Sequence, residues 1–196
     1  MLEGNVMRNV CDFVGRALAS GSCASALSTI ALACSGHLEC GRAFAPVNAV
    51  SHWIWGDRAI HADRPAWRHT AVGYVIHHAM SVFWAAFYEG WVHGAPSRRR
   101  PGPAIAAGLA VAAAACFVDL KLTPRRLTPG FERRLSPLSL AFVYLAFGLA
   151  LPLITLWRPR QTDERQGGDA RDVPGTEASG TDRQRDGEGL TRAGQR

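Results

Sequence analysis

The chain has 196 residues, a net charge of +6 and a mean hydropathy of −0.03. This average combines two unlike parts, because residues 158–196 are almost free of aliphatic side chains and hold eight Arg and eight Asp or Glu. Such a stretch cannot bury enough apolar surface to offset the entropy of ordering it. We therefore predict an all-α fold, a four-helix transmembrane bundle in residues 1–157, followed by a disordered polar tail in residues 158–196.

Basic residues cluster beside hydrophobic runs, at 98–100 and 121–134. Basic flanks are usual for membrane helices, which need anchors at anionic headgroups. The isoelectric point near 9.5 is therefore explained without a nucleic-acid surface. We expect the lipid bilayer and anionic lipid headgroups as partners, and no nucleic acid.

The first predicted span covers residues 17–36 and is built largely from small side chains. Gly21 and Ser25 repeat the small-x-x-x-small spacing that lets membrane helices approach closely, as do Ser22 and Ala26. No short apolar core precedes a cleavage site, so we expect this span to remain in the protein.

A long loop follows, and its residues suggest a short helix opened by a proline. Asn48 and His52 fall on one face of that helix. Trp53 and Trp55 suit headgroup depth, so we predict an interfacial or re-entrant segment after the first span. The sharper alternative is that the segment folds over the bundle mouth and presents its polar side chains to the second span. The loop candidates are Asn48, His52 and Asp57.

The second predicted span, residues 70–92, is the most informative part of the chain. Its 23 residues reach about 34 Å as a helix, against roughly 30 Å of hydrocarbon. Ionisable groups at that depth mark functional sites unless they are paired. A helical wheel places one polar, aromatic and small arc opposite a lipid-facing arc that contains Ile76, Phe83 and Phe87. The polar candidates on this span are His77, His78, Ser81, Tyr88 and Glu89.

Metal ligation is an alternative for these polar groups. Glu89 and His93 are spaced i, i+4 and could share a metal, and His77 or His78 could bind one together with His52 or Asp57. The ligand set is incomplete, however, and neither HExxH nor a pair of ExxH motifs is present. We predict no cofactor, with hydrogen-bonded structural histidines preferred over a metal or a haem and a proton-linked role between these cases. The metal candidates are His52, His77, His78, Glu89 and His93.

The third and fourth predicted spans cover residues 104–120 and 138–157. The third is rich in alanine, so we expect it to be central and surrounded by other helices. The fourth carries bulky side chains such as Phe142 and Phe147, so we expect it to face lipid. An even number of spans places both termini on one side of the membrane. Lys and Arg counts on the two sides are equal, and we assign the termini to the cytoplasm because a long tail then needs no translocation.

Three strings carry a resemblance: APVNAVSHWIWGD, RPAWRHTAVGYVIHHAMSVFWAAFYEGW and PRRLTPGFERRLSPLSLAFVYLAFGLAL. They resemble a group of small four-span proteins of the proteobacterial inner membrane that have no assigned activity. The resemblance covers roughly residues 15–155. It implies a multi-pass protein of the bacterial inner membrane and carries over no catalytic residue.

The residues favour a non-enzymatic membrane protein, either a scaffold or a small permeation or proton-linked element. Its polar arc would line a cavity or an oligomer interface, and a solute path through so small a bundle would require a homo-oligomer. The alternative is a membrane redox or catalytic module that binds a metal or haem through the His cluster.

Overall fold

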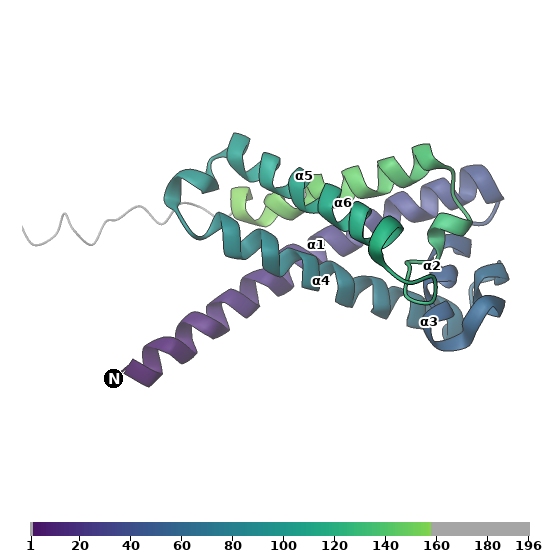
Figure 1. Cartoon of the computed structure of the whole chain (residues 1–196), viewed down its shortest axis with the longest axis horizontal. Helices are drawn as coiled ribbons and strands as arrows, with labels where there is room; N and C mark the ends of the chain where they lie inside the picture. The colour runs from purple at the N-terminus through teal and green to yellow at the C-terminus, as the bar shows by residue number, and fades with distance from the viewer. Residues whose placement is uncertain (1, 158–196) are drawn as a thin grey trace, which may run out of the picture. The chain divides into compact units, whose positions relative to one another are not determined.

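The computed structural model describes residues 2–157, and the regular structure in that range is helical throughout, without a strand. The long helices are α1 (Leu2–Cys40), α4 (Val72–Val92), α5 (Pro101–Phe117) and α6 (Pro137–Trp157). They run beside one another in Figure 1, except for the N-terminal part of α1, which extends away from the others. The predicted tail, residues 158–196, lies outside the described residues. The expectation of an all-α fold is confirmed for the described part of the chain.

The helix bounds agree with the predicted spans except at the first helix. α6 begins one position before the predicted residue 138, and α5 is extended to Leu122 by η4 (Val118–Leu122). α1, in contrast, begins at Leu2 and not near residue 17, because nothing in residues 2–16 breaks a helix even though several side chains there are charged. Hydropathy located the apolar part of α1 and missed its polar extension.

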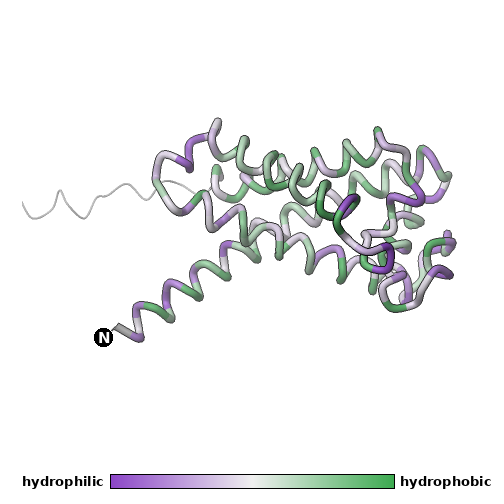
Figure 2. The backbone as a smooth tube through the Cα atoms, in the orientation of Figure 1, coloured by the Kyte–Doolittle hydropathy of each residue, from purple (hydrophilic) through white to green (hydrophobic). Residues whose placement is uncertain are grey.

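Three of the four long helices are apolar enough to cross a membrane by composition alone, and α4 is the exception. Three helical segments are long and apolar enough to cross a membrane: Glu3–Cys40, Pro101–Leu122 and Pro137–Trp157. α4 is long enough, but His77, His78 and Glu89 lower its hydropathy. Figure 2 shows hydrophilic positions within α4, whereas α6 is hydrophobic along most of its length.

α1 is the helix that holds the bundle together, since it packs against both α4 and α6. α5 packs mainly against α6 and much less against α4. The expectation that residues 104–120 form a central helix is therefore wrong. The most apolar window of that segment is 22% buried, against 44% for the windows in α1 and α6. Its small alanines permit close packing along one side only. α6, which we expected to face lipid, does so on one side at most, because Phe142 is 52% exposed while Phe147 is buried in the core.

Glycines set the distance between neighbouring helices at two crossings. A Cβ atom at Gly21 of α1 would lie 2.6 Å from the Cα atom of Val82 in α4. A Cβ atom at Gly108 of α5 would collide with the carbonyl oxygen of Gly148 in α6 and would lie 3.1 Å from Cδ of Pro152. Both crossings therefore need small side chains, and the small-x-x-x-small spacing of the first span indicated the one at Gly21.

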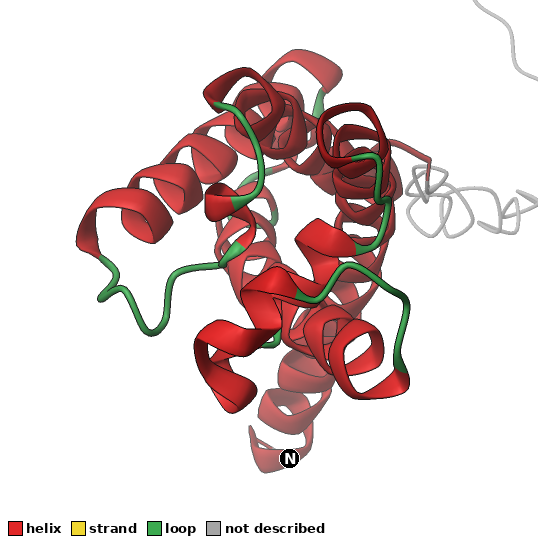
Figure 3. Cartoon of the chain, turned by 90° about the vertical axis from the view of Figure 1, so that its right-hand side faces the viewer, coloured by secondary structure: helices red, strands yellow, loops and turns green. Residues whose placement is uncertain are grey.

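Short helices cover one end of the bundle (Figure 3). The first of them, α2 (Ala45–Val50), begins at the expected proline and is buried along its whole length. Gly73 at the start of α4 lies so close to it that a Cβ atom would collide with the carbonyl oxygen of Val47. The prediction of one interfacial helix needs correction, because the chain turns at Ser51 and starts a separate helix, α3 (His52–Trp55). The remaining short elements there are η1 (Gly56–His61), η2 (Trp67–Ala71) and η5 (Phe131–Arg133), while η3 (Pro96–Arg99) joins α4 to α5 at the other end.

Candidate functional site

The polar arc of α4 faces the protein, as its helical wheel predicts. Its buried residues are Gly73, Ser81, Ala85, Tyr88, Glu89 and Val92. On the opposite side Phe83 and Phe87 are about half exposed, at 49% and 56%. Ile76 differs from expectation, because it packs against a core cluster that includes Val47 and Leu32. So does Trp91, which the helical wheel places on the polar and aromatic arc but which is 44% exposed.

An apolar cavity of about 250 Å³ lies between α4 and the segments that end α5 and begin α6. Most of its wall is aliphatic or aromatic, and a few polar groups converge on it from different helices. These polar groups include Ser28 of α1, His77, Ser81 and Trp84 of α4, Asp119 of η4 and Tyr144 of α6. A predominantly apolar pocket with a few placed polar groups is the usual form of a small-molecule site.

His77 joins the cavity wall to α1. Its Nε2 atom lies 2.9 Å from Oγ of Ser28, and Ser28 in turn donates to the carbonyl oxygen of Ala24 at 2.7 Å. Because the Ser28 hydroxyl hydrogen is engaged with Ala24, Ser28 accepts from His77, which places the imidazole hydrogen on Nε2. The Nδ1 atom of His77 is then a hydrogen-bond acceptor.

Asp119 and Tyr144 form the polar pair on the other side of the cavity. The Tyr144 hydroxyl donates to Oδ2 of Asp119 at 2.9 Å, which ties η4 to α6. Trp84 adds a donor, since its indole Nε1 is buried and has no hydrogen-bond partner among residues 2–157. The wall therefore holds a carboxylate, a phenol and an unused N–H within an apolar surround.

Glu89 lies apart from this cavity, in a charged cluster between α1 and α4. Its side chain is 1% exposed and accepts a hydrogen bond from the hydroxyl of Ser20. Oε2 of Glu89 lies 2.9 Å from Nδ1 of His93 and 3.8 Å from Nε of Arg16. Glu89 and His93 therefore contact each other directly. This arrangement is an ion-pair cluster that joins two helices.

Asn48 contacts the start of the second predicted span at Thr70, which agrees with the sharper alternative for the loop. Its Nδ2 donates to the carbonyl oxygens of Ala62 and Arg64 at 2.7 and 3.0 Å. Its Oδ1 accepts from the Thr70 hydroxyl at 2.7 Å. With all these bonds made and no exposed surface, Asn48 has a structural role.

The other two loop candidates lie elsewhere. His52 and Asp57 line a second, polar cavity of about 670 Å³ at the covered end of the bundle. His77 is on the wall of the apolar cavity, and His78 packs against the ring of Tyr74 at 5.9 Å. Among the described residues no group of three or more His, Cys, Asp or Glu side chains could hold a metal ion. The structure does not bring His52 or Asp57 to His77 or His78.

Several residues of these sites were missed from the sequence. Asp119 had a detectable signal, because it is an acidic residue at the end of an apolar run, but its partner Tyr144 lies 25 positions away on another helix. Ser20 and Arg16 carried no signal, since their roles depend on how α1 crosses α4.

Comparison with known proteins finds no matching family model, no matching curated protein and no matching solved structure.

Proposed function

We propose that this chain is a four-span protein of the bacterial inner membrane, without enzymatic activity, that binds a lipid-like molecule in the cavity beside α4. The fourth span is α4 itself, in which His77 hydrogen-bonds to Ser28 of α1 and Glu89 is buried against α1. Because its buried face carries Ser81, Tyr88 and Glu89, α4 does not need high hydropathy to reside in the bilayer. The basic clusters at both ends of the bundle would contact anionic headgroups.

One observation supports the binding role most strongly. Polar groups from α1, α4, η4 and α6 converge on the apolar cavity, which lies where α4 packs little against α5. Asp119 with Tyr144, and the unpartnered indole N–H of Trp84, would fix the polar part of a ligand. The aliphatic and aromatic wall would hold its apolar part.

The resemblance to four-span inner-membrane proteins agrees with this proposal. α1 begins and α6 ends toward the same end of the bundle (Figure 1), so both termini would lie on one side of the membrane. We assign that side to the cytoplasm, because the polar tail then needs no translocation. A scaffold role without a ligand is the simplest competing explanation, and it predicts an empty cavity.

The test is native mass spectrometry of the protein purified in mild detergent and loaded from a bacterial lipid extract. We expect one lipid-like molecule retained by the unmodified protein and lost in Val118→Phe, because Val118 lines the cavity and a larger ring would fill it. Val75→Phe is the matched control, since Val75 is 63% exposed on the outer face of α4. Equal retention by both variants, or none by the unmodified protein, would contradict a ligand-binding cavity.

A further inference from the structure

We propose that the second cavity, at the covered end of the bundle, is a binding site for a phosphate group. It is lined by His52 and Asp57 from the α3–η1 segment and by residues of the loop between α5 and α6. The charged residues that this loop contributes are Arg125, Arg126, Glu132 and Arg133. This site is separate from the apolar cavity, and the proposal holds whether or not that cavity takes a ligand.

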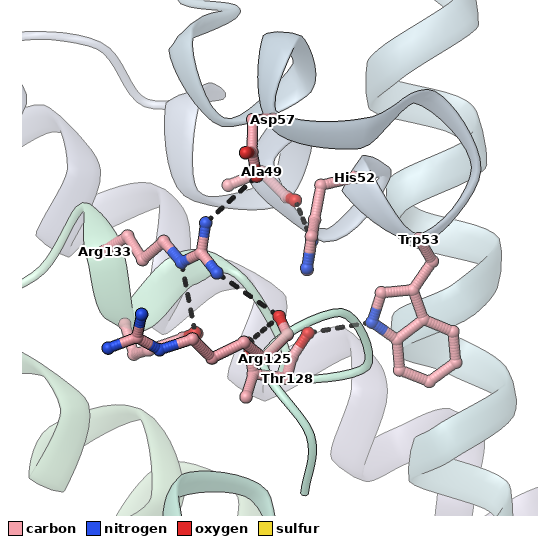
Figure 4. A network of polar contacts seen from close by, with 8 residues as sticks. Ala49, His52, Trp53, Asp57, Arg125, Thr128 and Arg133 are labelled. Atoms are coloured by element: carbon pink, nitrogen blue, oxygen red, sulfur yellow. Dashed lines mark hydrogen bonds and ion pairs between the residues drawn. The ribbon is translucent and has the colours of Figure 1, made fainter.

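His52 is the central observation. It is 2% exposed, and its Nδ1 lies 2.9 Å from the carbonyl oxygen of Ala49. Since a carbonyl can only accept, Nδ1 carries a hydrogen and donates it. The other ring nitrogen, Nε2, is buried without a hydrogen-bond partner in the described part of the chain. Figure 4 shows this imidazole projecting from α3 toward the segment that carries Arg125 and Arg133.

A buried polar atom without a partner is costly, and a native structure usually pairs it with a ligand or water. Because Nδ1 carries a hydrogen, Nε2 is an acceptor in the neutral ring and a donor in the protonated ring. In the neutral ring Nε2 is an acceptor and needs a donor such as the P–OH of a phosphate. In the protonated ring it donates to a charged phosphate oxygen. A phosphate monoester satisfies Nε2 in either form, because the same proton can sit on the imidazole or on the phosphate.

The formal charges of the cavity favour an anion, because its three arginines outnumber its two carboxylates. Arg133 lies beside both carboxylates, since its Nη1 is 3.2 Å from Oδ1 of Asp57 and its Nε is 4.0 Å from Oε1 of Glu132. Oε2 of Glu132 is buried without a hydrogen-bond partner within residues 2–157. It would accept from a hydroxyl or amine next to the phosphate.

Two further guanidinium groups remain for the ligand. The side chains of Arg125 and Arg126 line the cavity and make no hydrogen bond or ion pair within the described residues. Guanidinium groups bind phosphate oxygens through paired N–H donors. The loop itself is fixed, because the Trp53 indole donates to the Thr128 carbonyl at 2.8 Å and Arg133 donates to the Arg125 carbonyl at 3.2 Å. The backbone of this loop is therefore held in place before a ligand arrives.

The same phosphate chemistry has two sources, a free phosphate compound and the headgroup of a membrane lipid. The experiment compares them with the full chain in phosphatidylcholine nanodiscs. One arm titrates inorganic phosphate, with sulfate as the anion that lacks a proton to share near neutral pH. The other arm adds phosphatidate, a lipid phosphomonoester, or phosphatidylglycerol, a lipid phosphodiester, to the nanodiscs and measures bound lipid.

Three variants test the residues. Arg125→Gln/Arg126→Gln removes the free guanidiniums, and His52→Asn keeps a donor near the Nδ1 position while removing Nε2. Arg99→Gln/Arg100→Gln is the matched control, because it removes the same charge from exposed positions at the opposite end.

We expect binding of a phosphomonoester to weaken about tenfold or more in the first two variants and to be unchanged in the control. Binding of inorganic phosphate alone assigns a soluble ligand, binding of phosphatidate alone assigns a lipid headgroup, and binding of both assigns the phosphate group itself. Sulfate or phosphatidylglycerol binding equal to that of the monoesters would overturn the role of His52. No binding of any probe, or equal binding by all variants that remain folded, would overturn the site.

Discussion

Ser20 of α1 donates a hydrogen bond to the carboxylate of Glu89 in α4, 69 positions later in the chain. The same carboxylate contacts Arg16 and His93, so one buried side chain joins three polar partners. Removing one member of a buried ion pair typically costs about 3–5 kcal/mol, because the remaining charge loses its partner.

We therefore expect Glu89→Ala to lower the free energy of unfolding by about 3 kcal/mol. Glu89→Gln should cost less, because an amide oxygen can still accept from Ser20. Thermal unfolding in detergent measures both, with Glu3→Gln as an exposed control. A proton-linked element would behave differently: Glu89→Gln would abolish pH-dependent ion flux in liposomes while leaving stability nearly unchanged.

The contact between Gly108 and Gly148 yields a second prediction. We expect Gly108→Ala to destabilise the protein by about 1–3 kcal/mol, the usual range for overpacking, because the new methyl group would collide with the α6 backbone. Gly102→Ala is the control on the same helix, since nothing lies within 4 Å of a Cβ atom there. Equal melting temperatures for the two variants would show that α5 and α6 do not meet at this point.

Asn48 supplies a third prediction, because it satisfies two carbonyl groups and one hydroxyl at once. Asn48→Ala should cost about 2–3 kcal/mol through the groups left unpaired. Asn48→Asp should be at least as harmful, since a carboxylate would face the carbonyls of Ala62 and Arg64. Limited proteolysis within residues 56–66 reads out loosening of the covered end, and unchanged resistance to cleavage would contradict the structural role.

Substitution of His77 and His78 in α4 tests whether these histidines have a structural role or bind a metal. His77→Ala should destabilise by about 1 kcal/mol through the lost hydrogen bond to Ser28, and His78→Ala should have a smaller effect. Elemental analysis and an absorption spectrum of the purified protein accompany these variants. Near-stoichiometric metal, or a Soret band, that disappears in the variant with both His77→Ala and His78→Ala would support the metal- or haem-binding alternative.

Reporter fusions test whether α4 crosses the membrane. We expect alkaline phosphatase to be active when fused after Asp57 and inactive when fused after Gly94, because a crossing α4 places these two positions on opposite sides. The same activity at both positions would leave three crossings, the number that hydropathy alone supports.

The sequence predicted helix positions better than helix neighbours. The bounds of α4 and α6 followed from hydropathy, since an apolar run of that length has few other solutions. The inward face of α4 also followed, because polar Ser81 and Glu89 lie on one side of its wheel. The position of α5 did not follow, since alanine-rich helices suit both a central and an edge position.

Hydrogen bonds between side chains on different helices could not be predicted from the sequence, for a physical reason. The bond between Asp119 and Tyr144 depends on the relative rotation and axial shift of η4 and α6, which periodicity within one helix does not contain. The second cavity, at the covered end of the bundle, depends on a turn at Ser51 that brings His52 toward the loop between α5 and α6. The i, i+4 spacing predicted that Asn48 and His52 share one face of a helix. Because of the turn, Asn48 instead contacts Ala62, Arg64 and Thr70, whereas His52 lines the second cavity.

The packing of α1 between α4 and α6 has a consequence for biosynthesis. Of the four long helices α1 is made first, and it meets its last partner only after residue 157 has been synthesised. Until then the α1 face that packs against α6 lacks that partner. Assembly of this bundle is thus completed only when α6 has been made, and chains that stop before α6 should be recognised and degraded as unfinished products.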